Sequence, residues 1–86
     1  MSSTSPVGVN EPFKPIAADL DLTAVVWKTT SFTGGNDNCF EFGRCGEWIL
    51  TRDTFRRDQE PQVYSKAEVK ALIDGAIAGD LDYLLA

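Results

Sequence analysis

The clearest pattern of apolar positions lies near the end of the chain and predicts an α-helix. Apolar residues recur there at the spacing of one helix face, at Val69, Leu72, Ile73, Ala76 and Ile77. Ser65 and Glu68 have the spacing of a capping box, which marks the start of a helix, and Gly79 stands where a glycine commonly ends one. We expect most of this apolar stripe to be buried in the core.

Alternation with a period of two predicts antiparallel strands before this helix. Residues 38–42 and 47–52 are expected to pair as a hairpin across a tight connection at 43–46. A run of β-branched and aromatic residues at 24–31 predicts another strand ahead of the hairpin. The polar segment 53–61 is interpreted as a loop, and residues 62–64 fit a short edge strand.

Both faces of the predicted hairpin carry large apolar side chains, because side chains alternate along a strand. One face holds Phe40, Phe42 and Ile49, with Glu47 and Thr51. The other holds Cys39, Trp48 and Leu50, with Glu41 and Arg52. A sheet with one side in water alternates more cleanly. We therefore expect one face to meet the helix, while the second either meets another surface or is covered by the curl of the sheet itself.

These elements predict an α+β fold, a small twisted antiparallel β-sheet of three to five strands with one C-terminal α-helix packed on it. Residues 1–20 show no helix or strand period and are interpreted as a flexible N-terminal arm, whose later part is able to dock on the domain or on a partner. Residues 21–86 form the single domain. A domain of about 65 residues buries only about 60% of the surface that its unfolded chain exposes. Association with a second copy or another protein is the expected source of further stability.

Charge and targeting signals narrow the function classes. Eight basic residues against thirteen acidic ones give a net charge of -5, which disfavours nucleic-acid binding because that affinity comes from neutralised phosphates. The basic cluster of Arg52, Arg56 and Arg57 is interleaved with acidic residues. The chain has no secretory signal and no membrane-length apolar run. We expect a soluble, cytoplasmic protein with free thiols, although a bridge between Cys39 and Cys45 is sterically open across a hairpin.

The search for catalytic chemistry is negative. The chain has no histidine, which removes the commonest general base. Its two cysteines cannot supply a four-ligand zinc site alone. Gly34 and Gly35 lack the Lys-Ser/Thr that completes a phosphate-binding loop. We therefore predict no catalytic, cofactor-binding or metal-binding residues, and no enzymatic activity.

One further pattern is the order of motifs between residues 24 and 82. Its positions are Trp27, Gly34, Gly35, Cys39, Glu41, Arg52, Asp53, Pro61, Ser65 and Gly79. This order and spacing resemble the actinobacterial domain of unknown function 397 family. The chain departs from that family at Val69 and Leu72, where the family has aromatic residues, and at Phe40 and Phe42, where it has valines. We interpret these departures as aromatic bulk moved from the helix to the sheet.

Members of that family are typically encoded beside a helix-turn-helix transcriptional regulator, and several are linked to developmental control or to toxin–antitoxin-like pairs. The resemblance therefore implies a module that binds and modulates such a regulator. An acidic module suits a basic partner. The alternatives are a self-assembling homodimer with no regulator and, less favoured by the net charge, a direct DNA binder.

For the partner surface we select Trp27 and Trp48, with Arg52 and Asp53 at the rim. Tryptophan and arginine dominate the binding energy of many interfaces. Core packing is the competing explanation for both tryptophans, and it is the favoured one for Trp27.

Overall fold

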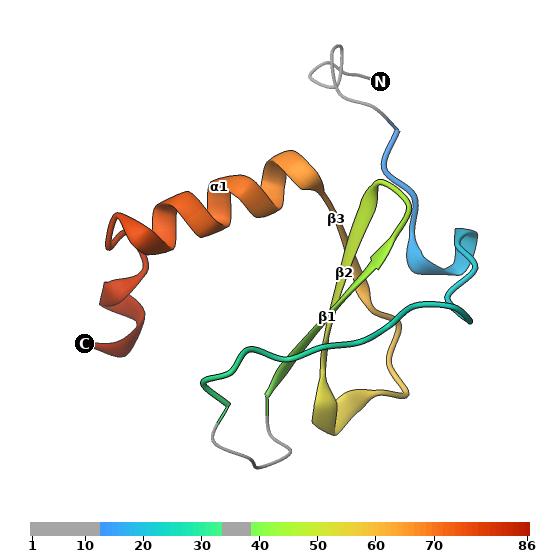
Figure 1. The fold of residues 1–86 in the computed structure, drawn as a ribbon, viewed down its shortest axis with the longest axis horizontal. Coiled ribbons are helices and arrows are strands. Elements are labelled where there is room, and N and C mark those ends of the chain that lie inside the picture. The colour runs from blue at the N-terminus through green and yellow to red at the C-terminus, as the bar shows by residue number, and fades with distance from the viewer. Residues whose placement is uncertain (1–12, 34–38) are drawn as a thin grey trace.

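The computed structural model describes residues 13–33 and 39–86 and has the predicted α+β fold. A three-stranded antiparallel sheet is followed by one α-helix packed on it (Figure 1). The strands and the helix are β1 (Phe40–Cys45), β2 (Trp48–Asp53), β3 (Gln62–Ser65) and α1 (Lys66–Ile77). Short 3-10 helices are η2 (Ala17–Asp19), η3 (Thr54–Arg56) and η4 (Asp82–Leu85). Gly34 and Gly35 lie outside the described residues.

The hairpin forms as predicted, but its turn is shorter. The strand order is β1-β2-β3, and Cys45 pairs with Trp48, so only Gly46 and Glu47 connect the two strands. Gly46 has φ 60°, which suits the first central position of a two-residue hairpin turn. The prediction of a connection over 43–46 was therefore wrong, because Gly43 is a strand residue paired with Leu50.

The strand predicted at 24–31 does not form. Only Lys28 pairs with the sheet, through two backbone hydrogen bonds with Phe42 of 2.8 and 2.7 Å. Residues 24–31, which we call the crossing segment, pass over the sheet at Gly43. An added Cβ at Gly43 would overlap Val25 and lie 3.3 Å from the Trp27 ring. A segment that crosses a strand at an angle meets it at one pair only, so the sheet stops at three strands.

The core lies on the sheet face that carries Leu50 and Val63. Leu50 is 0% exposed, Val63 8% and Ala17 3%. Half-buried apolar side chains around them come mainly from residues 20–27. The hairpin face that carries Leu50 is therefore covered by the residues that precede the hairpin in the sequence. Ala17 is buried in this core, so the later part of the segment 1–20 docks on the domain, which is one of the two possibilities left open by the sequence; residues 1–12 lie outside the described residues.

Helix α1 has both predicted ends. The Ser65 hydroxyl accepts a hydrogen bond from the Glu68 N–H at 3.1 Å, and the Ser65 N–H donates to the Glu68 carboxylate at 2.8 Å. At the other end Gly79 has φ 88°. The Gly79 N–H donates to the Ala76 carbonyl at 3.1 Å and the Asp80 N–H to the Gly75 carbonyl at 2.9 Å, which is a Schellman motif.

The apolar stripe of α1 is largely uncovered, so the prediction that it is core was wrong. None of its residues is buried; Val69 is half-buried, and Leu72, Ile73 and Ile77 are exposed. The helix starts directly at the end of β3, so its first turns contact the sheet and the later turns project beyond it (Figure 1).

Candidate functional site

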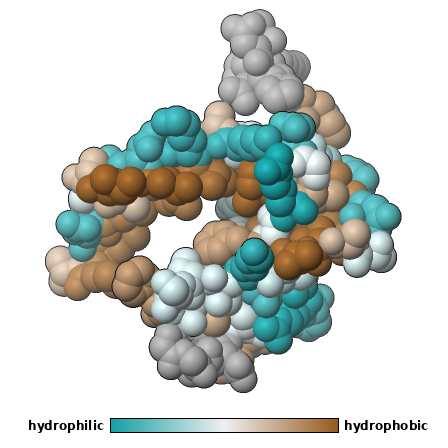
Figure 2. All heavy atoms as spheres, viewed as in Figure 1, coloured by the Kyte–Doolittle hydropathy of each residue, from teal (hydrophilic) through white to brown (hydrophobic). Residues whose placement is uncertain are grey.

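An open apolar cleft separates the sheet from α1 and the C-terminal segment. Figure 2 shows hydrophobic side chains along the side of α1 that borders this opening, continuing toward the C-terminus. We call this surface the α1 cleft. We define it by large apolar side chains on α1, on the C-terminal segment and on the sheet face opposite the Leu50 core, each more than one third exposed: Phe40, Tyr64, Leu72, Ile73, Ile77, Tyr83 and Leu84.

The two walls of the α1 cleft follow from helix and strand periodicity. On α1, Val69 is half-buried against the sheet, and Ile73 and Ile77 follow it at four-residue intervals on the same side. On the sheet, the register places Ile49 opposite Tyr64, on the face turned away from the Leu50 core. Ile73 is 53% exposed and Ile77 81%. Two apolar walls therefore face a space that no described side chain fills.

Charged side chains border the cleft unevenly. Lys70 and Asp74 form an ion pair of 2.6 Å one turn apart on α1, and Lys66 pairs with Glu47 at 3.1 Å. The basic residues of α1 therefore lie in its first half, and Asp74 lies in its second half. A cleft with apolar walls and a charged border is able to hold an amphipathic helix.

Three of the residues selected from the sequence form one internal network. The Arg52 guanidinium lies 3.8 Å from the centroid of the Trp27 ring, and its Nε donates to the Glu41 carboxylate at 2.9 Å. Arg57 donates to the same carboxylate through Nε and a terminal nitrogen, both at 3.1 Å. Glu41 is 8% exposed. These contacts fasten the crossing segment to the sheet.

Hydrogen bonds hold the pKa of Glu41 below its ordinary value. The donors from Arg57 make the largest contribution, burial of the carboxylate opposes it, and the donor from Arg52 adds to the lowering. The carboxylate stays charged because two guanidinium groups surround it. Glu41 therefore acts as the electrostatic centre of the network and not as a proton donor.

The other selected residues lie apart from the α1 cleft. Trp48 is half-buried and packs against the core. The Asp53 carboxylate accepts a hydrogen bond from the Phe55 N–H at 2.9 Å and caps η3. The Cys39 N–H donates to the Thr54 hydroxyl at 3.1 Å. The structure brings Trp27 and Arg52 together, but it gives these side chains local roles in packing and capping.

A disulfide between Cys39 and Cys45 does not fit the hairpin. The two residues lie at opposite ends of β1, which spans Phe40–Cys45. Six residues of extended strand separate them by about 20 Å, whereas bridged cysteines need Cα atoms about 4.4–6.8 Å apart. Neither cysteine forms a disulfide, and the Cys45 thiol donates to the Asp21 carbonyl at 3.5 Å.

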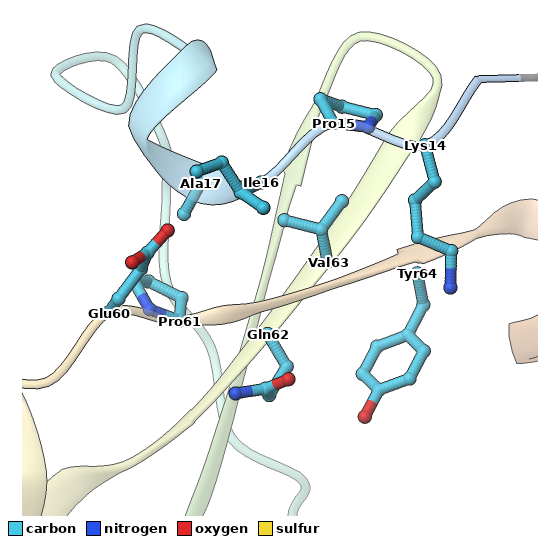
Figure 3. A pocket seen from close by; sticks show the side chains of 9 residues that line it. All are labelled: Lys14, Pro15, Ile16, Ala17, Glu60, Pro61, Gln62, Val63 and Tyr64. Carbon is cyan, nitrogen blue, oxygen red and sulfur yellow. The ribbon is translucent and has the colours of Figure 1, made fainter.

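A second hollow, of about 400 Å³, lies where the N-terminal segment meets β3 (Figure 3). Lys14 on its rim pairs with Glu68 at 2.8 Å and lies 5.3 Å from the Tyr64 ring centroid. Glu60 accepts a hydrogen bond from the Ala18 N–H at 3.3 Å. Pro61, one of the motif residues, is part of its lining. Its charged side chains already hold neighbouring segments together, so this hollow is a seam between two parts of the domain.

Residues 13–33 and 39–86 contain neither a metal-binding cluster nor a membrane-spanning helix. No group of three or more histidine, cysteine or acidic side chains there is arranged to hold a metal ion. No helix in those ranges has the length and apolar character needed to cross a membrane.

Sequence reasoning found the apolar stripe of α1 but assigned it to the core. The sequence feature that distinguishes a buried stripe from an exposed one is the presence of apolar side chains on both faces of the hairpin. Residues 15–27 cover one face, and α1 is too far extended to cover the other. Comparison with protein-family models, curated proteins and solved structures finds no match to this chain.

Proposed function

We propose that this chain is a non-enzymatic, cytoplasmic regulatory module that binds and modulates a helix-turn-helix transcriptional regulator. The observation that carries the proposal is the α1 cleft, where Leu72, Ile73 and Ile77 are exposed to between 50% and 81%. Monomeric proteins rarely leave a large contiguous apolar surface in water, and such surfaces commonly mark interaction sites. An amphipathic helix of the partner would lay its apolar face in the cleft.

Charge supports a basic partner. The chain carries a net charge of -5, and Asp80 and Asp82 are exposed between α1 and the C-terminus. Complementary charge raises association rates and excludes partners of like charge. The resemblance to the domain of unknown function 397 family supplies the class of partner, a helix-turn-helix regulator. An antitoxin-like role, in which binding blocks the activity of the partner, is one form of this proposal.

Direct DNA binding has less support. Arg52 and Arg57 direct donors to Glu41, and Arg52 also lies over the Trp27 ring. Phosphate contacts by arginine and lysine supply most nucleic-acid affinity. Two of the three arginines in the only basic cluster of the sequence are therefore already engaged within the domain.

The test is crosslinked affinity capture from the native host with three tagged baits. These are the wild type, Ile73→Glu in the cleft, and Val26→Glu, whose side chain is 68% exposed on the crossing segment. Nuclease treatment before capture removes proteins bridged by DNA. We expect a helix-turn-helix protein with the wild type and Val26→Glu, and its loss with Ile73→Glu. Recovery of no such protein would contradict the proposal that a regulator is the partner. Equal recovery with Ile73→Glu would contradict the proposal that the α1 cleft is the binding surface.

A further inference from the structure

The apolar area left uncovered in the α1 cleft is large enough for a stable protein interface. The seven large side chains that define the cleft are between 37% and 81% exposed. At about 200 Å² for a fully exposed large side chain, they leave on the order of 800 Å² in water. The largest apolar patch of a typical monomer is about 300–600 Å². A standard interface buries about 800 Å² on each partner.

The charges beside the stripe make α1 complementary to itself in the antiparallel direction. Lys66, Lys70 and Asp74 follow one another at four-residue intervals and so form one row along the helix. That row borders Ile73 and Ile77, which lie three residues after Lys70 and Asp74 respectively. The row is basic in the first half of α1 and acidic at Asp74. Two antiparallel copies therefore place Lys70 of each helix near Asp74 of the other.

Helix dipoles favour the same arrangement. In an antiparallel pair, the partial positive charge at each N-terminus lies near the partial negative charge at the other C-terminus. The stripe, the charge row and the dipoles are all satisfied by one two-fold axis near Ile73.

We propose that a second copy of this chain closes the α1 cleft, with the two α1 helices packed antiparallel across a two-fold axis near Ile73. Each stripe then covers the other, and α1 of one copy lies over the open sheet face of its partner. A two-fold interface of this kind uses the same surface on both subunits. This proposal goes beyond the proposed function because it requires no regulator. A regulator that uses the same stripe would have to displace the second copy.

The first test is sedimentation equilibrium of the full chain over a range of micromolar concentrations. We expect a monomer–dimer equilibrium for the wild type and for Val26→Glu. Ile73→Glu places a charge beside the two-fold axis in both copies, so its dissociation constant should rise by more than about thirtyfold, as for loss of an interface hot spot. A wild type that is monomeric at every concentration overturns the proposal that a second copy closes the cleft. The capture of a regulator is judged separately, by the affinity-capture experiment.

The second test identifies the antiparallel arrangement by charge reversal. Lys70→Glu alone and Asp74→Lys alone each create two like-charge contacts across the axis and should weaken their own dimers by about fivefold. Mixing the two variants restores opposite charges at both contacts, so a mixed dimer should form in preference to either homodimer. The double variant Lys70→Glu/Asp74→Lys should dimerise like the wild type, and circular dichroism checks that α1 is retained in each variant. A dimer that is unaffected by the single reversals, or no preference for the mixed dimer, overturns this geometry.

Discussion

The Glu41 network provides the sharpest test of how the crossing segment is held on the sheet. Replacing Glu41 with glutamine keeps the shape of the side chain and removes its charge. The carboxylate accepts three hydrogen bonds, at 2.9 Å from Arg52 and at 3.1 Å twice from Arg57. The neutral amide keeps one acceptor oxygen, so it loses the second contact with Arg57, and it removes the charge that strengthens the hydrogen bonds from both guanidinium groups.

The expected loss can be estimated from the exposure of the two arginines. A hydrogen bond to a charged group contributes about 1.5–3 kcal/mol. The Arg57 side chain is 54% exposed, so solvent screens its share to below about 1 kcal/mol. The Arg52 side chain is 19% exposed, so its contact with Glu41 carries most of the stability, although the donors from the more exposed Arg57 contribute more to the lowered pKa. We expect Glu41→Gln to lower the free energy of unfolding by about 2 kcal/mol, against a total of about 5 kcal/mol for a small domain.

The assay is urea unfolding followed by tryptophan fluorescence at one fixed protein concentration, because association adds to apparent stability. Glu47→Gln is the matched control. Its carboxylate pairs with Lys66 but the side chain is 79% exposed, so the expected loss is below about 0.5 kcal/mol. A loss for Glu41→Gln no greater than that of the control would refute the network as a source of stability.

The pH dependence gives the same network a second signature. Because the pKa of Glu41 is lowered in the folded state, its contribution is complete above the ordinary glutamate pKa of about 4.3 and is lost as the pH falls through the lowered value. The difference in stability between the wild type and Glu41→Gln should therefore be constant from neutral pH to about pH 5 and shrink below it. A difference that stays constant down to strongly acidic pH would contradict the assignment.

Three further predictions concern the backbone and the thiols. Gly43→Ala should lower the free energy of unfolding by about 1–3 kcal/mol because its Cβ overlaps the crossing segment, whereas Gly75→Ala, whose Cβ meets only a carboxylate at 3.5 Å, should be neutral or stabilising in the same urea assay. Ser65→Ala should cost about 1 kcal/mol through loss of the cap and reduce the helical circular dichroism signal, and an unchanged signal and midpoint would contradict the capping role. After mild oxidation, Cys39 and Cys45 should both still react with a thiol reagent in the monomer fraction, and an intramolecular bridge would contradict the β1 geometry.

Local chemistry made part of the fold predictable. The capping box at Ser65 and the glycine end at Gly79 depend on backbone groups within a few residues, so the sequence alone was sufficient to place both ends of α1. The two faces of the hairpin were also assigned correctly, because alternation is a property of any strand. The turn was misplaced because Gly43 and Gly46 both resemble turn glycines, and only the approach of the crossing segment distinguishes them.

Long-range packing made the rest unpredictable. The residues at 24–31 have the composition of a strand, but the direction in which they cross β1 depends on contacts with residues distant in sequence. Alternation placed Glu41 and Arg52 on one face of the hairpin, but it could not place Trp27 against them. The apolar stripe of α1 has the same sequence pattern in a buried helix and in an interface helix. Its exposure follows from the short link at Ser65, which directs α1 away from the sheet.

The exposed stripe also bears on the stability of α1 itself. A helix of 12 residues is marginal in water on its own, because most helical stability in proteins comes from packing an apolar face. The cap at Ser65 and the Schellman motif at Gly79 together contribute on the order of 1–2 kcal/mol, and α1 contains a glycine that costs about 1 kcal/mol relative to alanine. The local terms therefore nearly cancel. Covering Leu72, Ile73 and Ile77 would stabilise α1, so the association proposed above would complete the domain as well as hold a partner.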